Sequence, residues 1–573
     1  MKKLLKYLQG YEVQCVMGPL FKLLEATFEL FIPLVVAQIV DVAIANSDGW
    51  YAAKMCGVMI ALGIIGLACA ITAQYFAARA AVGFSTRLRH AVMEHILGLS
   101  YAQIDRIGTS TMITRMTSDI NQVQNGVNLT LRLLLRSPFV VFGAMVMAFT
   151  IDAQAALVFL GLIAVLCVVV FGIMLITMPM YKRVQGSLDK VTAATRQNLA
   201  GVRVLRAFCK EADEQADFNA QTADLMAKQE TAGRISALLN PLTFVIVNLA
   251  VVILIRVGAL KVEGGILTQG LVIALYNYMS QILVELIKMA NLIVSITKAV
   301  ACAGRVAAVL DIEPDQTEGS FAPEKLAGKV EFDNVTAHYA GAGEASLENI
   351  SFTAEPGQTI GIIGGTGSGK TTLINLLPRL YDAASGTVRI DGVDVKEFDA
   401  ETLRSLIGIV PQKSVLFKGT IRSNLLWGRE DATDADLWNA LEIAQAREVV
   451  KSKEGELDAE VSQNGANFSG GQRQRLAIAR ALVRKPAILI LDDSASALDY
   501  ATDARLRQSI RTMAPTTFIV SQRAASVRYA DQIIVLDDGQ MVGLGTHDEL
   551  LKTCPVYQEI YYSQFPKEVA ALV

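Results

Sequence analysis

The sequence lacks the patterns that would hold a structural metal or a disulfide framework. Its seven cysteines are scattered and odd in number, and no Cys-x-x-Cys pair or cluster of cysteine with histidine occurs. These absences argue against a zinc site and against a network of disulfides. The cysteines are therefore interpreted as small buried apolar residues.

An excess of charge is also missing. Charged residues make up 19% of the chain, and the formal net charge is −3 at pH 7. Because no strongly basic footprint exists, we expect no nucleic-acid partner. The N-terminal stretch MKKLLKYLQG is basic, but no compact apolar core or small-residue cleavage site follows it, so it is not predicted to be a cleaved signal.

What the chain has in abundance is apolar sequence. Hydrophobic residues make up 52% of its 573 residues, and the mean hydropathy is +0.39. Segments long enough to cross a bilayer are predicted at about residues 14–44, 54–80, 127–151, 155–180, 236–258 and 268–297. The alternative, a buried helical core in a soluble protein, is weak because residues 159–180 carry no charge.

The connections between the spans predict the orientation. Lysine and arginine gather at the N-terminus, after the second span and after the fourth, whereas the short connections after the first and third spans have none. By the positive-inside rule, both termini are predicted to be cytoplasmic. The two long cytoplasmic connections, about residues 81–126 and 181–235, keep a helical pattern. Their tips are predicted to dock on another domain rather than to form a solvated hairpin.

Several charged residues fall inside predicted spans: Lys22, Glu25, Glu29, Glu285 and Lys288. Such residues normally face a water-filled cavity or each other. Two interpretations of these charges stay open. They contact amphipathic cargo, or they pair locally, Lys22 with Glu25 and Glu285 with Lys288. Arg132 and Arg136 are placed near the cytoplasmic edge of the third span.

The second half of the chain has a different character. A transmembrane domain over 1–305 and a Pro/Gly/acid-rich linker over 306–327 precede a region, 328–573, in which short β-type runs alternate with helical ones. We predict an all-α six-helix transmembrane domain with long cytoplasmic helical extensions, followed by an α/β domain with a largely parallel sheet.

A phosphate-binding loop opens this second half. It follows a predicted strand and opens a helix, and its residues are Gly364, Gly365, Thr366, Gly367, Ser368, Gly369, Lys370, Thr371 and Thr372. Glycines let backbone N–H groups close around phosphate oxygens at a helix N-terminus. Lys370 is predicted to reach the β- and γ-phosphates, and Thr371 to ligate Mg²⁺.

Two further motifs belong to the same chemistry. Asp492 and Asp493 follow a four-residue apolar run. Asp492 fits the acid that holds Mg²⁺ in P-loop nucleotidases. Asp493 is positioned where a general base could face the attacking water. Upstream lies a second anion cradle before a helix, formed by Ser469, Gly470, Gly471 and Gln472.

Together these motifs closely resemble the ATP-binding cassette (ABC) transporters, specifically half-transporters with the exporter fold. The resemblance implies that Tyr339 stacks on adenine and that Gln412 touches Mg²⁺ and links the cassette to the membrane domain. It implies ATP and Mg²⁺ as cofactors and a dimer in which each ATP lies between one P-loop and the partner's SGGQ segment. It further implies a multi-pass protein of the bacterial inner membrane.

Two positions depart from the family pattern. Asp493 stands where the family has Glu, and Gln522 stands where it has His. Both changes affect the hydrolytic step and neither affects binding, so the site is predicted to bind ATP well and to cleave it poorly; the alternative is that Asp and Gln are working substitutes. An intact SGGQ beside a weakened site resembles the degenerate-site subunit of bacterial heterodimeric multidrug-type exporters.

The predicted function is therefore export of amphipathic small molecules or drugs, driven by ATP hydrolysis, in a heterodimer with a second half-transporter in the lipid bilayer. Uptake of a metal-chelate, lipid flipping and an ATP-sensing regulatory role are the alternatives. The sequence leaves the substrate and the partner unidentified.

Overall fold

The computed structural model describes residues 2–317, 319–339, 343–494 and 498–565. The chain forms two compact units. Met1–Leu97 with Ser110–Ile312 form the first, here called the membrane unit, and Gly98–Thr109 with Glu313–Val573 form the second, the cassette unit.

The membrane unit consists of helices. In the part of the chain that the structure describes, six helical segments are long and apolar enough to cross a membrane: Glu12–Ile44, Gly49–Leu97, Thr109–Ile151, Ala153–Ala200, Glu211–Glu263 and Gln269–Leu310. The prediction of six spans is confirmed. The elements that build them are η1 (Lys2–Leu8), α1 (Glu12–Gln38), η2 (Ile39–Ile44), α2 (Gly49–Leu97), α4 (Thr109–Thr114), η3 (Arg115–Asp119), α5 (Ile120–Leu133), α6 (Arg136–Ile151), α7 (Ala153–Ala200), α8 (Val202–Ala207), α9 (Glu211–Ala237), α10 (Leu239–Glu263) and α11 (Gln269–Leu310).

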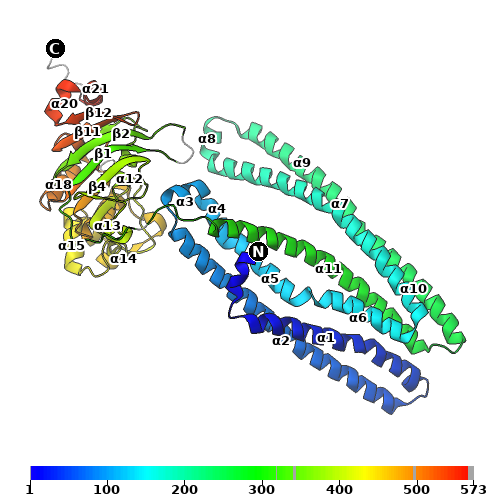
Figure 1. Cartoon of the computed structure of the whole chain (residues 1–573). Helices are drawn as coiled ribbons and strands as arrows, with labels where there is room; N and C mark the ends of the chain where they lie inside the picture. The colour runs from blue at the N-terminus through cyan, green and yellow to red at the C-terminus, as the bar shows by residue number, and fades with distance from the viewer. Residues whose placement is uncertain (1, 318, 340–342, 495–497, 566–573) are drawn as a thin grey trace. The chain divides into compact units, whose positions relative to one another are not determined.

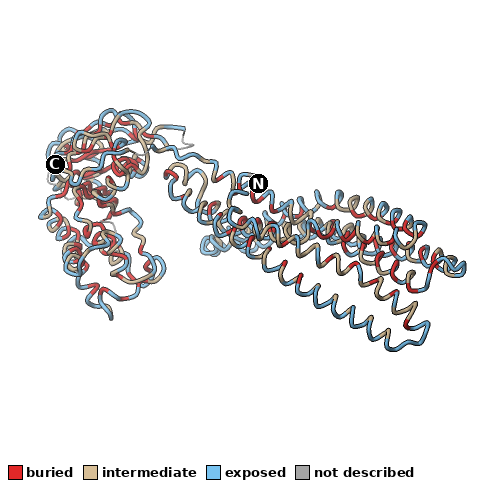
Figure 2. Tube along the Cα trace, turned by 60° about the horizontal axis from the view of Figure 1, so that its bottom comes forward, coloured by how far each residue is buried: buried red, intermediate tan, exposed pale blue. Residues whose placement is uncertain are grey.

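The helices of this unit pack along their small and apolar faces. Helix α1 lies along α2, α11 lies along α5 and α6, and α7 lies along α9 and α10 (Figure 1). Buried side chains include Ala144, Phe159 and Tyr278, while large apolar side chains such as Val168 and Phe244 point outward. In Figure 2, where exposed residues are pale blue, long stretches of the membrane-unit helices have this colour. An outward apolar surface is what a bilayer-facing helix requires, because lipid solvates it.

Helices α2 and α7 run far beyond their apolar parts, as the helical pattern of the long connections predicts. After α2 comes the short helix α3 (Tyr101–Ile107), whose N-terminus is closed by a capping box between Ser100 and Gln103. The Gln103 amide also donates a 2.7 Å hydrogen bond to the carbonyl of Glu313, and both residues belong to the cassette unit. The Tyr381 hydroxyl of the cassette donates to Asp105 of α3 at 2.6 Å, so the first tip groups with the cassette unit as predicted. Docking of the second tip, around α8, stays a prediction.

The described residues of the cassette unit form three sheets. The six-stranded sheet has the order β12-β11-β3-β10-β9-β6, and its strands are parallel except for β12. The four-stranded sheet is antiparallel and has the order β2-β1-β4-β5. The third sheet is the pair β7 and β8. The largely parallel sheet was predicted, and the separate antiparallel sheet was not. The strands are β1 (Val330–Ala337), β2 (Leu347–Ala354), β3 (Thr359–Gly364), β4 (Ser385–Ile390), β5 (Val393–Asp394), β6 (Ile407–Val410), β7 (Gly419–Thr420), β8 (Glu460–Val461), β9 (Ile488–Asp492), β10 (Thr516–Val520), β11 (Gln532–Asp537) and β12 (Gln540–Gly545).

Two apolar cores stabilise this unit, and they use opposite faces of the central strands. In β9, Ile488 and Ile490 join one core while Leu489 and Leu491 join the other. Strands buried on both faces read as continuous apolar runs, which is the pattern seen in ILILD and TTFIV. The remaining helices are α12 (Lys370–Leu376), α13 (Ala400–Leu406), α14 (Ile421–Leu426), α15 (Asp434–Ile443), α16 (Arg447–Lys451), η4 (Glu456–Asp458), η5 (Gln463–Gly465), α17 (Gly470–Val483), α18 (Tyr500–Arg511), α19 (Ala524–Val527), α20 (His547–Thr553) and α21 (Pro555–Gln564).

Candidate nucleotide-binding site

The predicted phosphate loop connects strand β3 to helix α12. Gly367 and Gly369 have φ values of +88° and +91°, in the left-handed region that favours glycine. Gly364 is required for a second reason: a Cβ there would lie 2.1 Å from the carbonyl oxygen of Leu536 on the neighbouring strand. The local sequence thus folds into a tight loop whose backbone N–H groups can converge on an anion.

Lys370, the first residue of α12, folds back over this loop. Its ammonium donates to the carbonyl oxygens of Gly364, at 3.1 Å, and Gly365, and to the hydroxyl of Ser368 at 3.2 Å. Burial lowers the pKa of Lys370 below its usual range, against the opposing attraction of Asp492 and Asp493. The ammonium is thus held inside the loop, where bound phosphate oxygens would replace its carbonyl partners.

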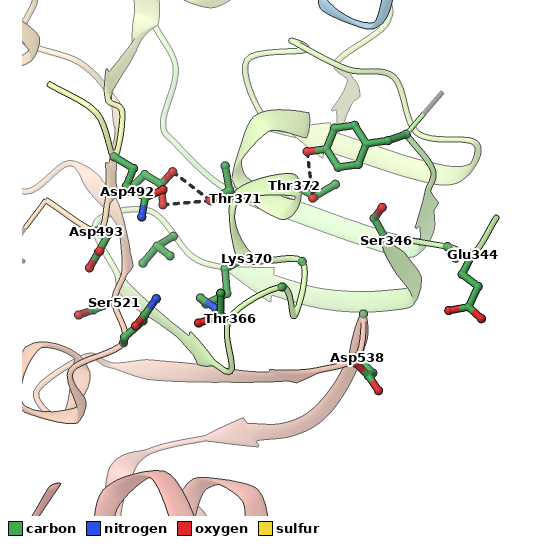
Figure 3. A pocket seen from close by; sticks show the side chains of 18 residues that line it. Glu344, Ser346, Thr366, Lys370, Thr371, Thr372, Asp492, Asp493, Ser521 and Asp538 are labelled. Carbon is green, nitrogen blue, oxygen red and sulfur yellow. Dashed lines mark hydrogen bonds between the residues drawn. The ribbon is translucent and has the colours of Figure 1, made fainter. Parts of the chain in front are cut away.

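Asp492, the last residue of β9, and Thr371, the second residue of α12, contact each other. The Thr371 hydroxyl is 3.1 and 3.3 Å from the two carboxylate oxygens of Asp492 (Figure 3). Burial raises the pKa of Asp492 above its ordinary value, although the Thr371 hydrogen bond and the charge of Lys370 act in the opposite direction. This pair offers oxygen atoms only, which is the donor set that Mg²⁺ prefers, so the residues present fit that ion.

The two departures from the family pattern meet at the ends of adjacent strands. Val520 of β10 is the register partner of Asp492 of β9, and the Asp493 amide donates to the Val520 carbonyl at 2.9 Å. Asp493, Ser521 and Gln522 therefore stand side by side, and all three line the same cavity as Lys370. Because β9 and β10 are neighbours in the sheet, Asp493 and Gln522 lie close together in the cavity that also contains Lys370.

The cavity has a volume of about 600 Å³. Of the predicted binding residues, it is lined by Tyr339, Thr366, Gly367, Gly369, Lys370, Thr371, Thr372, Gln412, Asp492, Asp493 and Gln522. Elsewhere in the cavity, the Tyr339 hydroxyl lies 3.1 Å from that of Thr372. A nucleotide could thus place its base near Tyr339 and its phosphates at Lys370.

The predicted second cradle lies elsewhere. Ser469 is the N-cap of α17 and forms a capping box with Gln472. None of the four residues from Ser469 to Gln472, all of which the structure describes, lines the cavity around Lys370. Within this chain, the cradle and the P-loop therefore do not form one site.

Some cavity residues were not predicted. Glu344, Ala345, Ser346, Asp538 and Gly539 also line the cavity, from the segment before β2 and the turn between β11 and β12. A Cβ at Gly369 would lie 2.5 Å from the carbonyl oxygen of Ser346. The only sequence signal for this wall is the Asp-Gly pair at 538–539, which predicts a hairpin turn but no ligand contact.

A polar cluster lies in the membrane unit. The Arg136 guanidinium donates at 2.6 Å to Glu285 and at 2.6 Å to Glu29, and the Ser137 hydroxyl donates to Glu285 at 2.7 Å. Lys288 also pairs with Glu285, at 2.8 Å. The predicted local pairs, Lys22 with Glu25 and Glu285 with Lys288, are both present. From the sequence, Arg136 was predicted to lie near the cytoplasmic edge of the membrane. Its partners Glu29, on α1, and Glu285, on α11, were not predicted.

The comparisons with known proteins agree with this architecture. The family model for the ABC transporter transmembrane region matches residues 15–286, and the ABC transporter model matches residues 347–496. An uncharacterised ABC transporter ATP-binding protein of Mycobacterium tuberculosis is 38% identical over 571 residues, which cover 98% of this chain and 97% of that protein. The uncharacterised Bacillus subtilis protein YfiB is 35% identical over 99% of both chains. This chain belongs to the ABC transporter family.

Two further proteins share sequence or fold with this chain. An ATP-dependent lipid A-core flippase of Vibrio vulnificus is 30% identical over 485 residues, 84% of this chain and 83% of that protein. The structure of a bacterial Atm1-family ABC exporter with ATP bound superposes with a TM-score of 0.80 over 96% of this chain and 98% of that one, at 24% identity. The fold is therefore that of an ABC exporter, and the chain is a multi-pass membrane protein that couples ATP hydrolysis to transport.

Proposed function

We propose that this chain is one half of a heterodimeric exporter and carries the weakly hydrolytic ATP site. The observation that carries the proposal is the presence of Asp493 and Gln522 on the wall of the nucleotide cavity. The binding groups, Lys370, Thr371 and Asp492, are all in the same cavity. In this proposal the pocket grips ATP and cleaves it slowly.

The chemistry of the two residues supports slow cleavage. Asp is one methylene shorter than the Glu of the family pattern, so its carboxylate lies about 1.5 Å further from an attacking water. Errors of about 1 Å in such positions cost about 10²-fold in rate. Gln522 has no cationic form, so it can give the γ-phosphate only a neutral hydrogen bond, about half as strong as a charge-assisted one.

Magnesium would be held by the residues whose oxygens already converge. Thr371 and Asp492 would supply direct ligands, with the Gln412 amide at the cavity wall as a third group. When bound, Mg²⁺ would neutralise phosphate charge. The chain's own residues would orient the phosphates through Lys370 and the loop amides, and hold the base at Tyr339.

The separation of the SGGQ cradle from its own P-loop supports a dimer. A second anion cradle on the cassette surface, capped but remote from Lys370, suits the nucleotide of a partner subunit. If that partner has Glu and His where this chain has Asp493 and Gln522, the cradle completes a fully hydrolytic site. Both termini would lie in the cytoplasm of a bacterial cell, below its inner membrane.

The cargo would be an amphipathic small molecule. A cavity of about 400 Å³ lies between α1, α6 and α11, and its lining includes Glu29, Gln281 and Lys288 beside apolar Ile32 and Val284. Glu285 already accepts from three groups, so it serves the interhelical network rather than cargo. Glu29 and Lys288 keep side-chain exposures of 38% and 46%, and they are the charged groups that cargo would meet.

The test is to locate hydrolysis within the assembled transporter. The chain would be co-purified with a candidate partner half-transporter that has the family Glu and His, then trapped with vanadate and a photoreactive ATP analogue. We expect trapped ADP predominantly at the partner's P-loop, and slow turnover by this chain alone. Equal trapping on both subunits, or rapid turnover by the chain alone, would contradict the division of labour.

Lipid flipping is a second candidate, favoured by the likeness to the lipid A-core flippase. Reconstituted vesicles with fluorescent lipids separate it from drug export. ATP-dependent loss of label from one leaflet, without movement of soluble amphipathic dyes, would favour the flippase.

A further inference from the structure

Tyr381 lies between the base end of the nucleotide cavity and helix α3. It follows α12 in the chain and does not itself line the cavity. Tyr339, which does line it, packs edge-on against Tyr381, with ring centroids 5.2 Å apart and an interplanar angle of 82°. Edge-to-face aromatic pairs have a preferred geometry, so a shift of one ring is felt by the other.

The other side of Tyr381 contacts α3. Its hydroxyl donates a 2.6 Å hydrogen bond to a carboxylate oxygen of Asp105, and its ring lies 6.2 Å from that of Tyr101. Burial and the neighbouring Asp105 raise the pKa of the Tyr381 phenol above its usual range, so the hydroxyl stays protonated as a donor at neutral pH. All of these contacts lie within the cassette unit.

We propose that Tyr381 is a positioning residue that reports occupancy of the base end of the pocket, through Tyr339, to the docking helix α3. The inference rests on the proposed role of Tyr339 as the base-stacking residue. A base stacked on Tyr339 fixes that ring, the fixed ring limits the motion of Tyr381, and the Tyr381 hydroxyl then holds Asp105. At the phosphate end, by contrast, the Lys370 ammonium donates to the carbonyl oxygens of Gly364 and Gly365 and to the Ser368 hydroxyl, all of which belong to the loop itself.

Helix α3 is suited to receive such a signal. It has seven residues, and short helices with few buried residues open readily. No residue of α3 is buried in the structure. Its order therefore depends on external contacts, of which the Tyr381–Asp105 bond is one.

The experiment measures amide hydrogen exchange of residues 98–109 in the full-length chain in nanodiscs. The non-hydrolysable analogue AMP-PNP and inorganic tripolyphosphate are compared, each at ten times its own measured Kd. We expect AMP-PNP to slow exchange in α3 by about fivefold more than tripolyphosphate, the lower end of typical coupling between sites. Tyr381→Leu should remove the difference, and Tyr381→Phe, which keeps the ring, should reduce it to about twofold.

Tyr529→Phe is the matched control, since Tyr529 is an exposed cassette tyrosine outside this chain of contacts, and it should keep the full difference. Equal protection by both ligands in the unmodified chain, or a full difference in Tyr381→Leu, would overturn the relay. Tyr339→Ala separates the premise from the inference: if it leaves the Kd of AMP-PNP unchanged, the stacking assignment fails, whatever Tyr381 does. Neither outcome depends on where ATP is hydrolysed.

Discussion

Restoring the family residues at 493 and 522 should convert this pocket into a faster ATPase. Asp493→Glu extends the carboxylate by about 1.5 Å toward the cavity. If the present deficit is positional, the extension should raise the rate of cleavage by up to about 10²-fold. Gln522→His exchanges a neutral hydrogen bond for a charge-assisted one, a gain of about 1 kcal/mol, or about fivefold in rate.

The two gains should not simply multiply. Asp493 and Gln522 lie on adjacent strand ends and face one reacting phosphate, so their effects are coupled. We expect the double variant to exceed Asp493→Glu by less than the fivefold gain of Gln522→His alone. The assay is single-turnover hydrolysis of radiolabelled ATP by the purified full-length chain, with the Kd for ATP measured beside it.

The backbone at residue 493 adds a check on folding. Its φ is +43°, in the left-handed region that Asp adopts more readily than Glu. If Glu costs a further 1 kcal/mol there, the melting temperature should fall by about 2–4 °C. Asp538→Glu is the matched control, because Asp538 also has φ +43° and lines the same cavity, on the turn before Gly539 (Figure 3).

Two results would contradict this prediction. An unchanged rate in both Asp493→Glu and the double variant, with ATP affinity and melting temperature preserved, would mean that residues 493 and 522 do not limit cleavage. A comparable gain in Asp538→Glu would mean that any added methylene on this wall acts nonspecifically.

Three further outcomes are expected. Lys370→Ala should weaken ATP binding by at least about 100-fold in calorimetry, since it removes the buried ammonium. Arg136→Met should lower the free energy of unfolding in detergent by about 1–3 kcal/mol, because Glu285 loses its guanidinium partner and keeps only Ser137 and Lys288; Arg136→Met with Glu285→Gln should recover part of that loss. Because burial raises the pKa of Asp492, the Mg²⁺-dependent gain in ATP affinity should fall as the pH is lowered toward that raised pKa and the carboxylate takes up a proton, and Asp492→Asn should abolish both the gain and its pH dependence.

The sequence predicted those features that are encoded locally. The P-loop is contiguous, and the helical pairs Lys22–Glu25 and Glu285–Lys288 are three residues apart, so spacing alone places them. The six spans follow from runs of apolar residues. These features need no knowledge of which helix lies beside which.

The features that were missed depend on distant contacts. Arg136 meets Glu29 and Glu285, which are 107 and 149 residues away in sequence, and no local pattern links them. The wall formed by Ser346 and Gly539 likewise depends on a strand end meeting a turn. The contact of Tyr381 with Asp105 spans 276 residues and joins a cassette loop to a helix between two membrane spans.

The division of the pocket between strands explains how binding and cleavage can be altered separately. Lys370 and Thr371 come from the loop and helix after β3, whereas Asp493 and Gln522 follow β9 and β10. Substituting the last two changes side chains at strand ends and leaves the buried residues of β9 and β10, and the glycine loop, as they are. Substitutions at these two positions can therefore slow ATP hydrolysis while ATP binding and the fold are kept. In the proposed heterodimer that is the combination required, because a nucleotide held without being cleaved keeps the two cassettes together while the partner's site turns over.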